Sequence, residues 1–124
     1  MLSLKVVDVR EYIDTAGRSP FTKWLHSLNV QAAAKVATAL ERIADGNLSN
    51  VKPAGQGVLE YKIDFGPGYR IYFGRDGDRL VILLAGGTKK RQQGDIRHAK
   101  ANWEDYRKRK TQGERQHGTD QGFS

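Results

Sequence analysis

The sequence predicts one α+β domain: a small curved antiparallel sheet with helices on one face, in the order β, α, α, β, β, β, α. Three observations predict this class. At 124 residues the chain is long enough for one hydrophobic core and short for two. Two segments with alternating polarity flank Gly66-Pro67-Gly68, which is a turn sequence. Apolar residues at helical spacing occur before and after that pair of segments.

The amino-terminal part predicts a strand and two helices. Residues 4–12 alternate loosely and are rich in valine, which favours a strand. Ser19-Pro20 is a typical helix start, with an N-cap serine and proline at the first helical position. Asn29 restarts the signal, and the second helix should end at Gly46, a plausible C-terminal cap. The two apolar stripes comprise Phe21, Trp24, Leu25 and Leu28, and then Ala33, Val36, Ala37, Leu40 and Ile43.

The central hairpin is predicted to pair residues 57–65 with residues 69–73, after an irregular stretch at 47–56. Leu59, Tyr61, Ile63 and Phe65 should face the core together with Tyr69, Ile71 and Phe73. A register around Gly66-Pro67-Gly68 sets Asp64 opposite Arg70 and Lys62 opposite Tyr72. The other face would then expose a cluster made of Glu60, Lys62, Asp64, Arg70 and Tyr72.

The carboxy-terminal part predicts a buried strand, a basic loop and a last helix. Asp76-Gly77 is a hairpin turn, and residues 80–85 form a strand covered on both faces that Gly86-Gly87 would end. After the basic loop 88–91, a helix places Ile96, Ala99, Trp103 and Tyr106 on one side and ends in the cations 107–110. We therefore expect a folded domain over residues 1–110. Residues 111–124 contain too little apolar surface to repay ordering, so we expect a disordered polar tail.

Composition favours a soluble cytoplasmic protein that meets a polyanion. The net charge is +7, with seven Lys/Arg against six Asp/Glu in residues 1–60 and fourteen against eight afterwards. Such one-sided positive charge favours nucleic acid or an acidic protein as partner. The mean hydropathy is −0.65, and no segment is typical of a membrane span or secretory signal. The absence of cysteine excludes disulfides and thiol chemistry.

The candidate site is the polar face of the hairpin together with the basic loop. RNA can be cleaved by its own 2′-hydroxyl without a metal if a base, phosphate-binding cations and a proton donor are supplied. Glu60 would be the base or orient Lys62, Arg70 and Lys89 would bind the phosphate, and Tyr72 would stack on a base or donate a proton. The alternative is a solvated cross-strand salt-bridge ladder without function. His26, His98 and His117 each stand alone, so neither a metal nor another cofactor is predicted.

The hairpin and the basic loop carry a resemblance to a known family. The segment Gly57-Val58-Leu59-Glu60-Tyr61-Lys62-Ile63-Asp64-Phe65-Gly66-Pro67-Gly68-Tyr69-Arg70-Ile71-Tyr72-Phe73, followed by Leu83-Leu84-Ala85-Gly86-Gly87-Thr88-Lys89-Lys90-Arg91-Gln92 and Asp95-Ile96, resembles the addiction-module killer proteins of the RelE/ParE toxin superfamily. Within that superfamily the residues resemble the HigB-type toxins. The resemblance spans about residues 5–108 and does not reach the tail.

The resemblance implies a RelE-like (microbial ribonuclease-like) fold and a type II toxin. Such a toxin is neutralised by a helix-turn-helix antitoxin, enters the ribosome and cleaves mRNA there. The family's catalytic positions match Lys62, Arg70, Tyr72 and Lys89. Glu60 is added as a candidate because it lies on the same polar face of the hairpin. Many members have Asp at the Thr88 position and Arg at the Lys62 position. A lysine at this second position cannot make the bidentate phosphate contact that arginine makes. The carboxy-terminal aromatic or histidine of some members would have to be replaced by Tyr106 or His98.

RNA contacts are expected from Lys90, Arg91, Gln92, Arg107 and Lys108. Two other functions stay open at this point. A ParE-like inhibitor of DNA gyrase would bind its target without nuclease chemistry, and a nontoxic nucleic-acid-binding module would keep the charge asymmetry alone. A ribonuclease would produce new RNA 5′ ends, a gyrase inhibitor would block supercoiling, and a nontoxic binding module would not arrest growth.

Overall fold

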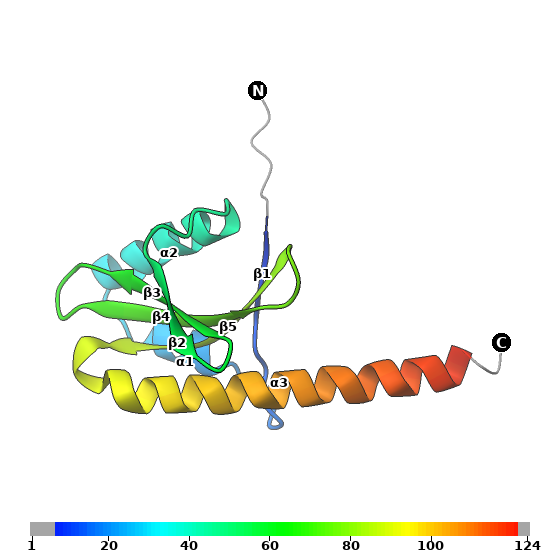
Figure 1. Ribbon diagram of the computed structural model, residues 1–124. Helices are drawn as coiled ribbons and strands as arrows, with labels where there is room; N and C mark the ends of the chain where they lie inside the picture. Colours follow the sequence, from blue (N-terminus) through cyan, green and yellow to red (C-terminus); the bar gives the residue numbers. More distant parts are fainter. Residues whose placement is uncertain (1–6, 122–124) are drawn as a thin grey trace.

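Five strands form one mixed sheet in the computed structural model, which describes the backbone of residues 7–121 and the side chains of residues 7–113. The strand order across the sheet is β1-β5-β4-β3-β2 (Figure 1). The elements are β1 (Asp8–Glu11), α1 (Pro20–His26), α2 (Val30–Ala44), β2 (Val51–Gly55), β3 (Val58–Ile63), β4 (Tyr69–Arg75), β5 (Leu80–Thr88), the 3-10 turn η1 (Lys89–Arg91) and α3 (Gln92–Gln121). The α+β class and the RelE-like arrangement expected from the sequence agree with this fold.

The sheet differs from the prediction at both of its edges. β1 pairs with β5 in parallel, so the sheet is not purely antiparallel. The other edge is β2, in the stretch 47–56 that was predicted to be irregular. β2 carries Pro53, which cannot donate a ladder hydrogen bond and is tolerated because β2 has a neighbour on one side only. The predicted strand 4–12 is confirmed over Asp8–Glu11, and its residues 4–6 lie outside the described part.

Helices α1 and α2 begin where the sequence predicts. The Ser19 side chain accepts a hydrogen bond from the Thr22 N–H, and the Asn29 side chain accepts one from the Ala32 N–H. Gly46 follows α2 with φ +82°, and its N–H donates to the Ile43 carbonyl, a geometry that glycine adopts at little cost. These caps define the ends of α1 and α2, whose apolar side chains pack against one face of the sheet.

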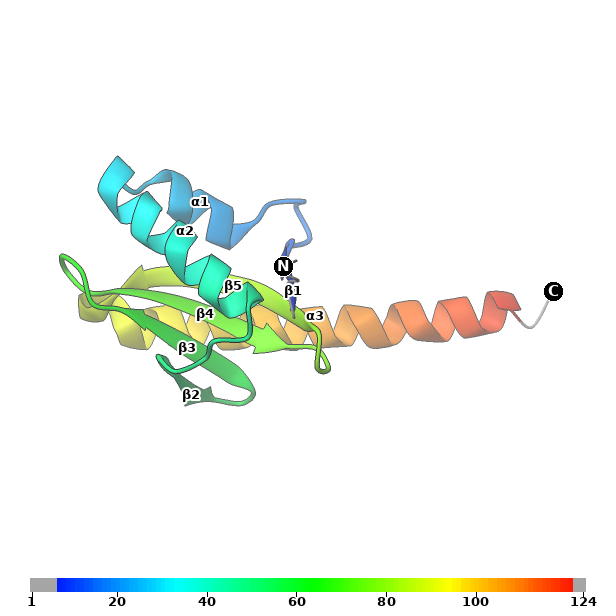
Figure 2. The same ribbon diagram turned by 90° about the horizontal axis from the view of Figure 1, so that it is seen from above.

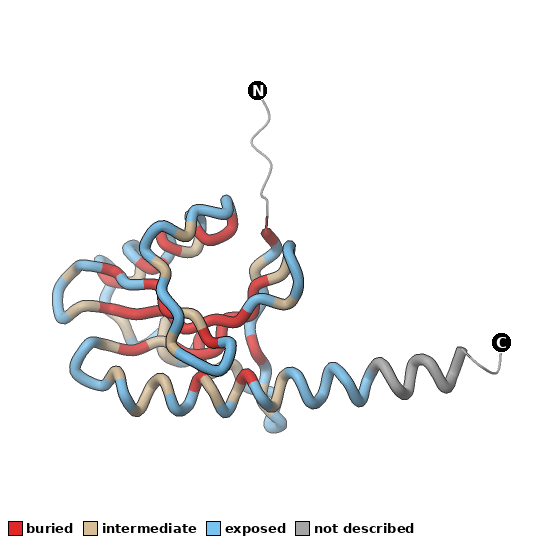
Figure 3. The backbone as a smooth tube through the Cα atoms, in the orientation of Figure 1, coloured by how far each residue is buried: buried red, intermediate tan, exposed pale blue. Residues whose placement is uncertain are grey.

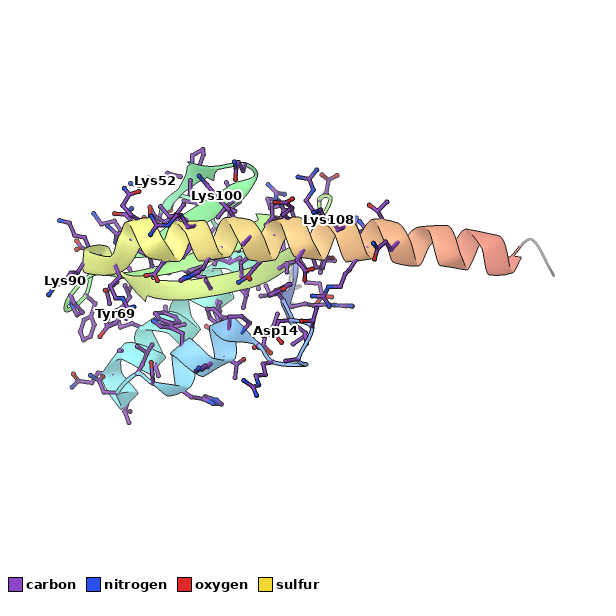
Figure 4. The ribbon with its side chains drawn as sticks, turned by 90° about the horizontal axis from the view of Figure 1, so that it is seen from below. Asp14, Lys52, Tyr69, Lys90, Lys100 and Lys108 are labelled. Atoms are coloured by element: carbon purple, nitrogen blue, oxygen red, sulfur yellow. The ribbon has the colours of Figure 1, made fainter. Side chains whose placement is uncertain are left out.

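The two faces of the sheet are covered by different helices. On one face α1 and α2 bury the side chains predicted for the core, including Phe21, Val36, Ile43, Ile71 and Phe73. α3 covers the opposite face, as the view from below shows (Figure 4). The prediction that the helices share one face is therefore wrong. Its physical reason is the short η1 turn, which carries the chain around the end of the sheet after β5.

On the α3 face, residues of β3, β4 and β5 and one side of α3 form a second core of Val58, Tyr72, Ile82, Leu84, Ala99 and Trp103. β5 is thus covered on both faces, as predicted. Gly86 and Gly87 do not end β5, since the strand continues to Thr88. They lack a side chain because Trp24 of α1 occupies the space beside Gly86 and Asp95 of α3 occupies that beside Gly87.

α3 continues well beyond the sheet, as the views along and across the sheet both show (Figures 1 and 2). The backbone is helical to Gln121, whereas disorder was predicted from Thr111 onwards and a helix end at 107–110. Gln, Glu, Arg and Lys are good helix formers, and extending an existing helix avoids the cost of nucleation. Burial along α3 stops near Tyr106, and residues 107–113 are exposed (Figure 3). The remainder of the predicted tail, residues 122–124, lies outside the described residues.

The hairpin register is shifted by two residues from the prediction. Lys62 lies opposite Arg70 and Glu60 lies opposite Tyr72. The connection uses residues 64–68 rather than 66–68, with Gly66 and Gly68 at φ +54° and +79°. Asp64 is therefore in the loop and has no partner strand residue. The predicted faces are nevertheless correct, because a shift of two residues preserves side-chain parity.

Candidate functional site

The polar face of the hairpin is buried under the first turns of α3. The exposed fractions are 1% for Glu60, 4% for Arg70 and 0% for Tyr72, so the predicted solvent-exposed cluster is wrong for these three residues. Only Lys62 of the predicted cluster on the strands is exposed. The charges along β3 and β4 were predicted to face solvent because alternation alone does not show a covering helix. We call Glu60, Arg70 and Tyr72, together with the neighbouring Asp95, the buried layer.

The Glu60 carboxylate is engaged at both of its oxygens. Oε1 accepts a 2.7 Å hydrogen bond from Gln92 Nε2 and lies 3.3 Å from Arg70 Nε. Oε2 lies 3.5 Å from Nζ of Lys52 on the neighbouring strand β2. This carboxylate therefore neutralises the buried Arg70 and pins α3 to the sheet. It is not free to act as a base on a substrate outside the protein.

Tyr72 and Asp95 complete the buried layer. The Tyr72 hydroxyl, Arg70 Nη1 and Asp95 Oδ2 make no hydrogen bond within the described residues. Burial raises the pKa of the Tyr72 phenol well above its usual range, and the nearby carboxylates of Glu60 and Asp95 add to the shift. Burial also raises the pKa of the Asp95 carboxyl, against the lowering effect of Arg91 and His98. Tyr72 is consequently a neutral phenol without access to substrate in this conformation.

A group of exposed cations surrounds the end of the sheet where the 64–68 loop meets η1. We call Lys62, Lys89, Lys90 and Arg91 the cationic rim; all four are exposed. The Lys89 N–H donates to the Gly68 carbonyl at 2.8 Å, which fixes η1 against the loop. A Cβ on Gly68 would lie 3.4 Å from Lys89 Cβ and 3.7 Å from Arg70 Nη1, so Lys89 adjoins the buried arginine. Lys90 marks this end of the molecule in Figure 4.

Lys62 joins the rim from β3. It lies opposite Arg70, which lies opposite Gly87 of β5. Two strand spacings, about 10 Å, therefore separate the Lys62 backbone from the strand that leads into η1. An anion bridging this gap would meet positive charge from both sides. The rim is suited to binding phosphate groups by charge.

Comparison with known proteins bears on this site. Residues 23–107 match the family described as Phage derived protein Gp49-like (DUF891). The chain belongs to the Gp49-like family. An uncharacterized protein from Haemophilus influenzae is 42% identical over 81 residues, which cover 64% of this chain and 82% of that protein. The Gp49-like family is a family of addiction-module killer proteins.

The Gp49-like segment includes the whole buried layer and the whole cationic rim. It excludes Lys108 and everything after it. The predicted RNA-contacting residues divide into two places, with Lys90, Arg91 and Gln92 at η1 and the start of α3, and Arg107 and Lys108 farther along α3. Gln92 hydrogen-bonds Glu60 inside the buried layer, whereas Arg107 lies fifteen residues later, about 22 Å along the helix axis.

The two candidates for the family's carboxy-terminal aromatic or histidine have different surroundings. The Tyr106 hydroxyl donates to Asp76 Oδ2 at 2.6 Å, at the β4–β5 turn on the opposite end of the sheet from the rim. Tyr106 therefore does not join this site. His98 is exposed on α3 one turn after Asp95, and its charge acts on that carboxyl. Of the two, only His98 lies near the site.

Lys52 and Asp95 belong to this site but were not predicted. Lys52 is placed beside Glu60 by β2, and the weak strand signal of Val51-Lys52-Pro53-Ala54-Gly55 hid that strand. Asp95 had one signal in the sequence, which is Gly87. A Cβ there would lie 1.8 Å from Asp95 Oδ2, so the glycine marks a close contact between strand and helix.

Among the described residues, no three His, Asp or Glu side chains are grouped as they would be around a metal ion. In the same residues no helix is both long and apolar enough to cross a bilayer. The arrangement offers positive charge at an exposed rim above a neutralised, buried ion pair.

Proposed function

We propose that this Gp49-like protein is the toxin of a type II toxin–antitoxin pair and that it cleaves mRNA on the ribosome. Membership of a family of addiction-module killer proteins supports the toxin role. The single observation that supports an RNA target is the cationic rim of Lys62, Lys89, Lys90 and Arg91 at one end of the sheet. The proposal places the protein in the HigB-type branch of the RelE/ParE superfamily, acting in the cytoplasm beside a helix-turn-helix antitoxin.

The rim would act on the scissile phosphate. Lys62 and Lys89 approach from β3 and from η1, so a phosphate between them is held from two sides. When the 2′-oxygen attacks phosphorus and the 5′-oxygen leaves, negative charge grows on the phosphorane oxygens, and the two ammonium groups stabilise it. The 2′-hydroxyl proton passes to solvent water as its oxygen attacks, and one of the two lysine ammonium groups donates the proton that the leaving 5′-oxygen takes up.

The buried layer has a positioning role in this proposal. Glu60 neutralises Arg70, and Arg70 adjoins Lys89 through Gly68. Gln92, the first residue of α3, is tied to Glu60 and follows directly after η1. The layer thus fixes the start of α3 and, with it, the three cations of η1.

The test is a map of new RNA 5′ ends in cells minutes after this chain is induced without its antitoxin. We expect cuts at fixed codon positions within translated frames, and none in untranslated RNA. Lys62→Ala/Lys89→Ala should abolish the cuts. Lys23→Ala/Arg42→Ala, which removes two exposed cations from α1 and α2, should keep them. Cuts that persist in the Lys62→Ala/Lys89→Ala variant contradict the site.

A ParE-like inhibitor of DNA gyrase is the second candidate, and one observation favours it. The residues that would supply a base and an acid, Glu60 and Tyr72, are buried, and so is Arg70. A binding inhibitor needs no such accessible groups. Inhibition of gyrase supercoiling by the purified chain, with growth arrest but without new RNA 5′ ends, would select this function.

A further inference from the structure

A second basic surface lies farther along α3, away from the cationic rim. It consists of two neighbouring grooves of about 530 and 480 Å³ that share Trp103, Arg107 and Thr111. The first groove is open between α3 and the β2–β3 turn, and its wall includes Gln56 and Lys100. The second groove continues toward the β4–β5 turn. We call the two together the α3 groove.

The α3 groove is rich in positive charge. Its lining has five cations and two carboxylates, namely Arg75, Lys100, Arg107, Lys108 and Lys110 against Asp76 and Glu104. Both carboxylates are engaged within the protein. Asp76 binds Lys110 at 2.5 Å and the Tyr106 hydroxyl at 2.6 Å, and Glu104 lies 3.1 Å from Lys108.

Two cations of the groove are available to a ligand. Lys100 and Arg107 form no ion pair among the described residues. They lie seven residues, or two helical turns, apart on α3, so they project from the same side of the helix. Figure 4 shows Lys52, Lys100 and Lys108 along one side of α3. The positive charge therefore extends along the helix rather than gathering at one point.

The β2–β3 turn is shaped to form the groove wall. Gly55, Gln56 and Gly57 have consecutive positive φ angles of 103°, 55° and 87°. A Cβ on Gly57 would lie 2.7 Å from Trp103 Nε1, and one on Gly55 would lie 3.1 Å from Lys100 Nζ. The two glycines let the turn approach α3 closely, while Gln56 adopts a conformation that side chains rarely favour. The groove is thus built by a specific local structure.

The chemistry of the lining selects one class of occupant. Trp103 is 7% exposed, so it offers neither a platform for stacked bases nor an apolar anchor for a peptide. Apart from the Glu104 carboxylate, which lies 3.1 Å from Lys108 Nζ, the polar groups of the first groove are ammonium, guanidinium, amide and hydroxyl groups, all of which bind phosphate oxygens. We infer that the α3 groove binds the phosphate backbone of RNA without reading its sequence. This binding requires no nuclease chemistry and uses residues outside the cationic rim.

The test measures binding of the purified full-length chain to a fluorescein-labelled 20-nucleotide 2′-O-methyl RNA, by anisotropy between 50 and 200 mM salt. The 2′-O-methyl groups prevent attack by the 2′-oxygen, so the result is independent of whether the protein cuts mRNA. Lys100→Gln/Arg107→Gln should weaken binding several-fold and lower the slope of log Kd against log salt by about 1.4, since each single-strand phosphate contact contributes about 0.7.

The matched control is Lys23→Gln/Arg42→Gln, which removes the same charge from α1 and α2 and should keep most of the affinity and slope. Circular dichroism and urea unfolding verify that both variants fold. Equal losses of RNA affinity in the two variants would overturn the proposed binding in the α3 groove, because net charge alone would then explain it. Displacement of the RNA by a 20-residue polyglutamate at equal or lower concentration would also overturn it, in favour of an acidic peptide.

Discussion

The two faces of the sheet are buried to a similar degree but by different means. On the α1–α2 face, aromatic and branched apolar side chains such as Phe21, Ile71 and Phe73 fill the interior. On the α3 face, apolar residues share the interior with the ion pair of Glu60 and Arg70 and with the Tyr72 hydroxyl. A polar strand pattern can therefore mark a covered face when the covering helix supplies partners such as Gln92.

This difference assigns the two faces different roles. The α1–α2 face is stabilised by buried apolar area, which carries no charge to titrate and so does not depend on pH. The α3 face depends on paired charges, because a buried ion left without its partner is costly. Three cations of the cationic rim lie on η1, directly before α3, and the α3 groove lies farther along the helix. Its attachment to the sheet consequently decides where both basic surfaces lie.

The largest expected effect follows from Glu60→Gln. It leaves the buried Arg70 guanidinium without a countercharge, which should lower the free energy of unfolding by about 3–5 kcal/mol. Urea unfolding measures the loss. Glu60→Gln/Arg70→Met should recover most of it, because the pair is then replaced by uncharged groups. A loss below about 1 kcal/mol in the single variant would show that water reaches this face.

Two glycines allow packing to be compared on the two faces. A Cβ on Gly74 would lie 2.6 Å from the Trp103 ring of α3, and one on Gly86 would lie 2.0 Å from the Trp24 ring of α1. Gly74→Ala and Gly86→Ala should each cost about 1–3 kcal/mol by overpacking. Gly113→Ala, with no atom within 4 Å of its Cβ, is the control and should be neutral or slightly stabilising. If Gly86→Ala leaves the free energy of unfolding unchanged, α1 moves away from the sheet readily.

A smaller effect should appear at low pH. Hydrogen bonds from Lys110 and Tyr106 hold the pKa of the Asp76 carboxyl below its usual range. The contribution of this carboxylate is therefore complete above its unfolded pKa of about 3.9 and is lost as pH falls through the lower folded value. Between pH 5 and pH 3, Asp76→Asn should lose less stability than the wild type in urea unfolding. Asp78→Asn, a neighbouring change of equal charge, should lose as much as the wild type.

The smallest effect is expected for Tyr72→Phe. The hydroxyl is buried and makes no hydrogen bond within the described residues, so its removal should change the free energy of unfolding by less than about 1 kcal/mol. Growth arrest on induction should persist. If arrest disappears while stability is unchanged, the hydroxyl reaches the substrate and α3 must open during the reaction.

Much of this fold is predictable because local signals agree with each other. Ser19-Pro20, Asn29 and Gly46 mark helix ends by hydrogen bonding, and the alternation along β3 and β4 fixes which side chains share a face. β2 has too weak a propensity to be recognised, and its existence depends on pairing with β3. The register of the hairpin was missed because Gly66-Pro67-Gly68 does not reveal where the five-residue connection begins.

The candidate site was harder to predict than the fold. The charges at Glu60 and Arg70 were identified, but their burial is a property of α3, whose side of the sheet is set by the three-residue η1 turn. Periodicity shows that α3 has an apolar side and does not show which face that side covers. The exposed cations Lys62 and Lys89 remain in the predicted site, whereas Arg107 belongs to a separate groove.

The most direct test uses purified translating ribosomes programmed with one defined mRNA, to which the purified chain is added. We expect primer extension to detect cuts within the open reading frame only when ribosomes are translating it. Lys62→Ala/Lys89→Ala should show no cuts, while Lys23→Ala/Arg42→Ala cuts like the wild type. Intact mRNA in every reaction, or equal cleavage of free mRNA, would contradict a ribosome-dependent ribonuclease acting through the cationic rim.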